Sequence, residues 1–71
     1  MTITQIDYYD KNYVGGIIRS KDYLSNIHKV DINITKRYRG GSNGRTYQEI
    51  VFIGSLNSIT RLKKDVLLIE Q

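Results

Sequence analysis

A strand–turn–strand pattern in the middle of the chain constrains its fold most strongly. Residues 29–38 alternate apolar and polar side chains, which predicts an antiparallel strand with one apolar and one solvated face. Residues 46–53 form a second strand-like segment, and Asn43-Gly44 lies between the two. Because both of these residues accept a positive φ, they are a strong signal for a hairpin turn. The residues expected on the apolar face of the first strand are Val30, Ile32, Ile34 and Tyr38.

The N-terminal part of the chain also has the composition of strands, since tyrosine and isoleucine are frequent. Residues 3–9 are the first expected strand. Residues 13–19 are the second, interrupted by Gly15-Gly16, which indicates a bulge, a bend or a close backbone approach. Polar turn-forming residues separate the two segments, so they are expected to pair as a hairpin. Residues 20–28 are interpreted as a connection with a short helix.

The C-terminal part predicts an amphipathic helix. Ser55 can cap its N-terminus through the side-chain hydroxyl, and apolar residues then recur at steps of three and four up to about Glu70. The alternative is a last strand over residues 66–70, since short apolar runs suit either structure. The helix is preferred because residues 61–65 contain no turn signal. The apolar stripe consists of Leu56, Ile59, Leu62, Val66 and Ile69.

Together these segments predict a single α+β domain over residues 1–71. Its antiparallel sheet has about four strands in two hairpins, and the C-terminal helix packs on one face. A chain of 71 residues without cysteine has no disulfides to support a small core, so its stability is expected to be marginal. Self-association would add buried surface. Leu67, Leu68 and an edge strand would supply the contact of a homodimer.

The location expected from the sequence is the cytoplasm. The N-terminus carries neither the basic segment nor the apolar run of a signal peptide. The longest apolar runs have four residues, far short of the ~20 that cross a bilayer, so no membrane contact is expected. The absence of cysteine agrees with a reducing compartment.

Catalytic and metal-binding arrangements are not expected. With His28 as its one histidine and no cysteine, the chain lacks the ligands of a structural zinc site. Its carboxylates are expected in turns and on solvated faces instead of converging in a pocket. The glycine-rich segment after residue 39 matches neither a P-loop nor a dinucleotide-binding turn, because a strand instead of a helix follows it. The sequence thus predicts a protein that is not an enzyme and needs no cofactor or metal ion.

Positive charge defines the candidate functional surface. The net charge is +4, and no acidic residue occurs between Asp31 and Glu49. Arginine can pair with phosphate or with guanine edges, and a tyrosine ring between arginines can stack on a base. Two groups of site residues follow. They are Lys36, Arg37, Tyr38, Arg39 and Arg45 around the second hairpin, and Arg61 and Lys64 on the C-terminal helix.

Two functions are compatible with this surface. The first is a small basic protein that binds DNA or RNA by holding phosphates with the hairpin segment KRYRGGSNGR. The alternative is an inhibitor or adaptor of the kind that phages and other mobile elements encode, for example an anti-defence or anti-CRISPR-like protein. Such a protein would bind a host protein or its nucleic-acid complex. The surplus of tyrosines and the apolar C-terminal turn support this alternative, because both suit a protein interface.

Overall fold

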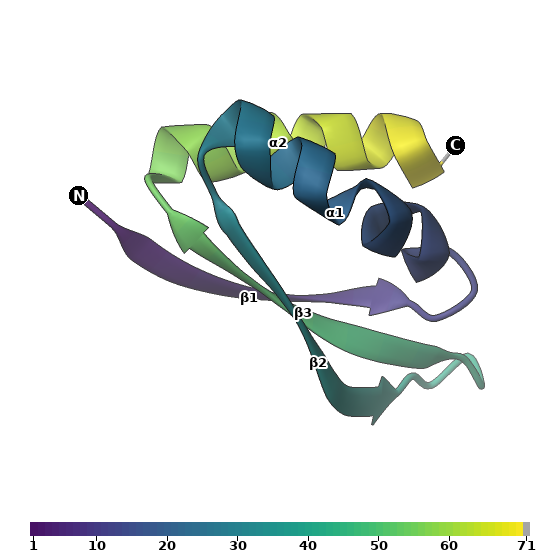
Figure 1. Ribbon diagram of the computed structural model, residues 1–71. Coiled ribbons are helices and arrows are strands. Elements are labelled where there is room, and N and C mark those ends of the chain that lie inside the picture. Colours follow the sequence, from purple (N-terminus) through teal and green to yellow (C-terminus); the bar gives the residue numbers. More distant parts are fainter. Residues whose placement is uncertain (71) are drawn as a thin grey trace.

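The computed structural model contains three strands and two helices in one small α+β domain (Figure 1). It describes the backbone of residues 1–70 and the side chains of residues 1–67. The strands are β1 (Ile3–Asp10), β2 (Asp31–Gly40) and β3 (Thr46–Gly54), and the helices are α1 (Val14–His28) and α2 (Leu56–Glu70). In this part of the chain, neither helix has the length and apolar character that a bilayer crossing requires.

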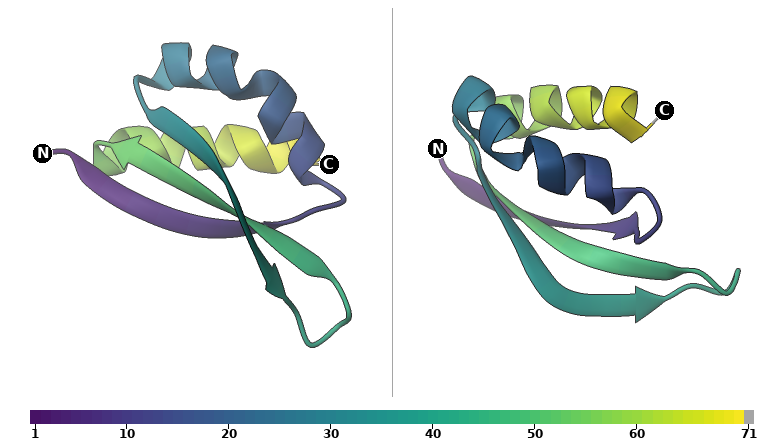
Figure 2. Two further views of the ribbon diagram at one scale, coloured as in Figure 1. Left: turned by 60° about the horizontal axis from the view of Figure 1, so that its bottom comes forward. Right: turned by 45° about the vertical axis from the view of Figure 1, so that its right-hand side comes forward.

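The strands form one antiparallel sheet in the order β1–β3–β2, with β3 in the centre. β1 and β2 therefore run in the same direction, and α1 connects them. This is the arrangement of the first five elements of the βαββαβ ferredoxin-like motif. Both helices lie on the same face of the sheet, as Figures 1 and 2 show. Within residues 1–70 the sheet has three strands, not the four that were expected.

The prediction of a strand over residues 13–19 is wrong, because most of these residues form the first half of α1. The first hairpin is therefore wrong too, and β1 pairs with β3 instead. α1 is stabilised by an apolar stripe, since Val14, Ile17 and Leu24 recur at helical spacing and are buried. Gly15-Gly16 lies in the first turn, where backbone N–H groups have no intrahelical partner. Burial of the stripe outweighs the low helix propensity of the two glycines.

The hairpin of β2 and β3 and the C-terminal helix are confirmed. Ser55 caps α2, because its side-chain Oγ accepts a hydrogen bond from the Ser58 N–H at 3.2 Å. α1 ends at His28, and its C-cap Lys29 adopts the left-handed conformation with φ 57° that closes many helices. The chain can then reverse direction and enter β2.

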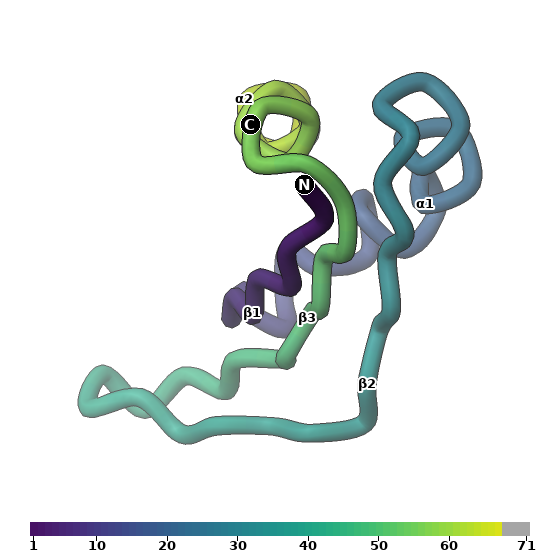
Figure 3. The backbone as a smooth tube through the Cα atoms, turned by 90° about the vertical axis from the view of Figure 1, so that its left-hand side faces the viewer, coloured from purple at the N-terminus to yellow at the C-terminus, as the bar shows by residue number. Residues whose placement is uncertain are grey.

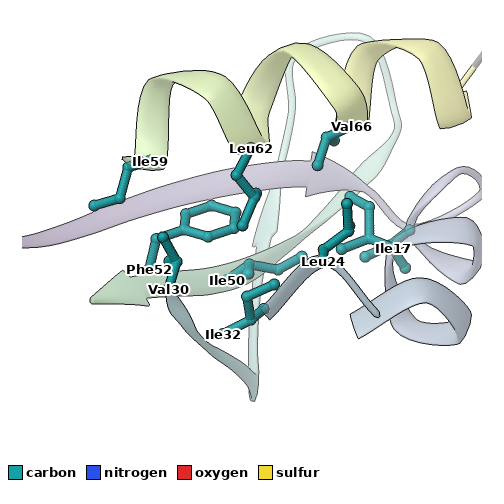
Figure 4. Packing of buried hydrophobic residues seen from close by; sticks show 10 residues of the cluster. Ile17, Leu24, Val30, Ile32, Ile50, Phe52, Ile59, Leu62 and Val66 are labelled. Carbon is teal, nitrogen blue, oxygen red and sulfur yellow. The ribbon is translucent and has the colours of Figure 1, made fainter. Parts of the chain in front are cut away.

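The hydrophobic core lies between the sheet and the two helices (Figure 4). Of the predicted stripe on α2, Ile59, Leu62 and Val66 are buried, whereas Leu56 is exposed. The side chain of Ile69 lies outside the described residues. The buried cluster consists of Val14, Ile17, Leu24, Val30, Ile32, Ile50, Phe52, Ile59, Leu62 and Val66.

Candidate functional site

A bulge in β2 positions the basic residues. Ile34 is opposite Ile50 and Tyr38 is opposite Gln48, so three residues of β2 stand opposite Glu49 alone. Extra residues in one strand bend it, and Figure 3 shows the sharp turn of β2. The bend carries the end of the hairpin away from the helices. Tyr38, which was expected on the apolar face, is consequently 51% exposed.

Two polar side chains hold the bulge in place. The Thr35 hydroxyl donates to the Glu49 carbonyl oxygen at 3.2 Å and accepts from the Arg37 N–H at 3.3 Å. The Gln48 side-chain amide is buried and donates to the Thr35 carbonyl oxygen at 2.9 Å. These bonds satisfy backbone groups where the ladder between β2 and β3 is interrupted. The bend therefore has a defined place in the sheet.

The hairpin tip is a four-residue turn whose last residue, Gly44, is in the left-handed region. The Gly44 N–H donates to the Gly41 carbonyl oxygen at 3.1 Å, and the Gly41 N–H donates to the Arg45 carbonyl oxygen at 2.8 Å. Gly44 has φ 78°, whereas Asn43 is not in the left-handed region, so the turn is of the type that precedes a glycine bulge. Asn43 instead donates its side-chain N–H to the Tyr47 hydroxyl at 3.0 Å. Gly41 is needed because a Cβ there would lie 2.6 Å from the Tyr47 ring.

The structure brings four predicted site residues together on β2, two of them in the bulge and two just beyond it. Lys36, Arg37, Tyr38 and Arg39 are all exposed there. Among the described side chains, no carboxylate lies within ion-pairing distance of the three cations. This end of the sheet therefore carries uncompensated positive charge, which attracts polyanions.

Arg45 differs from these residues because its charge is compensated. Its Nη1 lies 2.9 Å from Oδ2 of Asp10, at the end of β1. The hydrogen bond to Asp10 raises the pKa of Arg45, and the electrostatic attraction of the same carboxylate raises it further. Arg45 therefore stays charged and links the hairpin to β1, but the pair adds little net charge to the surface.

Two further residues, Tyr8 and Lys11, belong to the same end of the sheet. The Arg39 Cζ lies 5.0 Å from the centroid of the Tyr8 ring, and the Lys11 Nζ lies 5.2 Å from the centroid of the Tyr38 ring. Both distances are typical of cation–π contacts. The sequence did not predict these contacts, because they depend on the pairing of β1 with β3. A signal was present in the Tyr8-Tyr9 pair, since adjacent residues of a strand point to opposite faces.

The two predicted residues on α2 have different surroundings. Lys64 lines a groove of about 330 Å³ between β1 and α2, together with Tyr8 and Leu67. Lys63 on the wall of the same groove pairs with Asp7 at 3.0 Å. Arg61 is exposed on α2, in the helix layer, and the structure does not bring it to the hairpin.

His28 links the two helices. Its Nε2 lies 2.6 Å from Oδ2 of Asp65, so the contact joins the end of α1 to α2. This contact explains the histidine as part of the helix packing. In the described part of the chain, no group of three or more His, Asp or Glu side chains is placed to hold a metal ion.

Comparison with known proteins assigns no family to this chain. No protein-family model matches the sequence, and no curated protein shows significant similarity to it. The residues at the exposed end of the sheet are therefore the features that point to a function.

Proposed function

We propose that the protein binds nucleic acid through the exposed end of the β2–β3 hairpin and the adjoining end of β1. The observation that carries this proposal is the group formed by Lys36, Arg37 and Arg39, which have no carboxylate partner among the described side chains. Lys11, close to the Tyr38 ring, adds a fourth positive charge. Lysine and arginine that contact phosphates release condensed counterions, and this release supplies most of the affinity in sequence-independent binding.

The proposed activity is binding alone. The protein would act in the cytoplasm, would not be an enzyme, and would need no cofactor. Of the predicted residues on α2, Lys64 lines a groove that includes Tyr8, so it would extend the surface along β1. Arg61 would contribute only to the long-range electrostatic field that attracts nucleic acid. Low sequence specificity is expected, because phosphate contacts carry no sequence information.

The affinity should fall steeply with salt. Four phosphate contacts give a slope of log affinity against log salt of about −3.6 for a duplex and about −2.8 for a single strand. Fluorescence polarisation of labelled DNA and RNA between about 50 and about 200 mM salt measures this slope. No detectable binding of either nucleic acid at the lower concentration would rule out the proposal.

We also propose that the free edge of β1 mediates self-association. The Lys11 N–H donates to the Thr46 carbonyl oxygen of the neighbouring strand at 2.9 Å. Since the direction of backbone groups alternates along an antiparallel strand, the backbone groups of Thr4, Ile6 and Tyr8 point away from β3. The Ile6 side chain is exposed at this edge and Leu67 is exposed on α2 beside it. A second copy of the chain could pair with this free edge of β1. The side chain of Leu68, which was also expected in the dimer contact, lies outside the described residues.

Analytical ultracentrifugation should therefore detect a dimer at micromolar concentration. Ile6→Lys should shift it to the monomer, because a lysine on an edge strand opposes pairing with another strand. Ile18→Lys is the matched control, since Ile18 is exposed on α1 instead. A wild-type protein that stays monomeric would contradict this proposal. If neither nucleic acid nor a second copy binds, a phage-type inhibitor that pairs with a strand of a host protein becomes the better explanation.

A further inference from the structure

Neither helix covers the face of the sheet opposite the helices, which is the open face (Figures 1 and 2). Directly paired residues of neighbouring strands share a face. Ile6 is paired with Val51 and Tyr8 with Glu49, so these four residues lie on the open face. Ile6 is 54% exposed and Tyr8 is 40% exposed. Contacts with phosphates do not explain why an isoleucine and a tyrosine are exposed on this face.

Positive charge borders these exposed side chains. Arg39 is paired with Tyr47, so it lies on the open face as well, and its guanidinium group reaches the Tyr8 ring. Two carboxylates lie nearby, and each has a partner within the chain. Glu49 is only 7% exposed and accepts a hydrogen bond from the Tyr8 hydroxyl at 3.3 Å, and Asp10 is paired with Arg45.

We infer that the open face binds a single strand of nucleic acid, with unpaired bases against Tyr8 and Ile6 and phosphates near Arg39 and Arg37. This inference rests on the proposed function and names its substrate class. In a duplex, the faces of the bases are stacked inside, so an exposed ring and an isoleucine would contact nothing specific. In a single strand the base faces are free, and stacking on an aromatic side chain is a main source of affinity. The positive border matches the charge of the phosphates.

The test compares labelled single strands of DNA and RNA with the corresponding duplexes by fluorescence polarisation. We expect the better single strand to bind at least about tenfold more tightly than its duplex. Tyr8→Ala should weaken single-strand binding about 5- to 100-fold, as expected when one base loses its stacking partner. The same variant should weaken duplex binding less than single-strand binding, because the base faces of a duplex are stacked inside. DNA and RNA share this stacking chemistry. Whichever single strand binds more tightly shows whether the protein prefers deoxyribose or ribose.

Two control variants separate stacking from folding. Tyr8→Phe keeps the ring and loses only the hydrogen bond to Glu49, so it should bind like the wild type. Tyr23→Ala removes a tyrosine from α1 that is more exposed than Tyr8, at 66% against 40%, and should have no effect. Circular dichroism confirms that each variant is folded.

The outcomes distinguish this inference from the proposed function. If duplexes bind as tightly as single strands, or if Tyr8→Ala leaves single-strand binding unchanged, the inference is wrong while the hairpin proposal stands. If neither form binds at about 50 mM salt, both are wrong, and the open face is better explained as a protein interface.

Discussion

Alanine at Lys36, Arg37 and Arg39 together should lower the affinity for nucleic acid about 100-fold. Each exposed contact with a phosphate contributes roughly 1 kcal/mol, and three such contacts correspond to about two powers of ten in the dissociation constant. The salt dependence should change as well, because the slope falls by about 0.7–0.9 for each phosphate contact that is lost. All three side chains are exposed, so the fold should be retained. Fluorescence polarisation at several salt concentrations measures both effects.

The matched control removes three positive charges elsewhere. Arg19→Ala, Lys21→Ala and Lys29→Gly change α1 and the C-cap residue that follows it, and glycine suits the left-handed conformation at position 29. Both triple variants lower the net charge by three. If both lose affinity equally, the hairpin has no special role and binding depends on net charge alone. If the hairpin variant keeps the slope of the wild type, its cations do not contact phosphates.

The sequence predicted the elements whose signals are local. The β2–β3 hairpin follows from a period of two and from Asn43-Gly44, and α2 follows from a period of 3.6 after Ser55. Only the second half of α1 was predicted, as a short helix within residues 20–28. Its first half was missed because two glycines lie within its first turn and resemble an interrupted strand. Its buried stripe was visible in the spacing of Val14, Ile17 and Leu24. That stripe gains its importance only from packing against α2 and the sheet, which local propensity does not report.

The candidate site was predicted in part for a similar reason. The absence of acidic residues between Asp31 and Glu49 indicated the cations of the hairpin. The pairing of Arg45 with Asp10 and the contact of Arg39 with Tyr8 both depend on β1 lying beside β3. No local pattern specifies this long-range pairing. The bulge was also not visible, because its Thr35 and Gln48 bonds connect two strands.

Replacing Phe52 by alanine should leave the chain largely unfolded at room temperature. The ring is fully buried on β3 and meets the Tyr9 ring edge to face, with centroids 6.3 Å apart. Removing a buried phenylalanine costs about 3–5 kcal/mol. A domain of this size rarely gains more than about 3–5 kcal/mol from its core. Urea denaturation followed by circular dichroism should therefore show little or no folded baseline for this variant.

Two milder variants show whether the core or the open face holds the chain together. Phe52→Leu keeps an apolar side chain and should cost only about 1 kcal/mol, and Ile6→Ala on the exposed side should change stability by no more than about 0.5 kcal/mol. If Phe52→Ala instead unfolds cooperatively within about 1 kcal/mol of the wild type, the core is not the main source of stability. In that case the denaturation midpoint should rise with protein concentration, because association stabilises the folded state by mass action. A midpoint independent of concentration would place the stability within the single chain, and the free edge of β1 would then be available to a different partner.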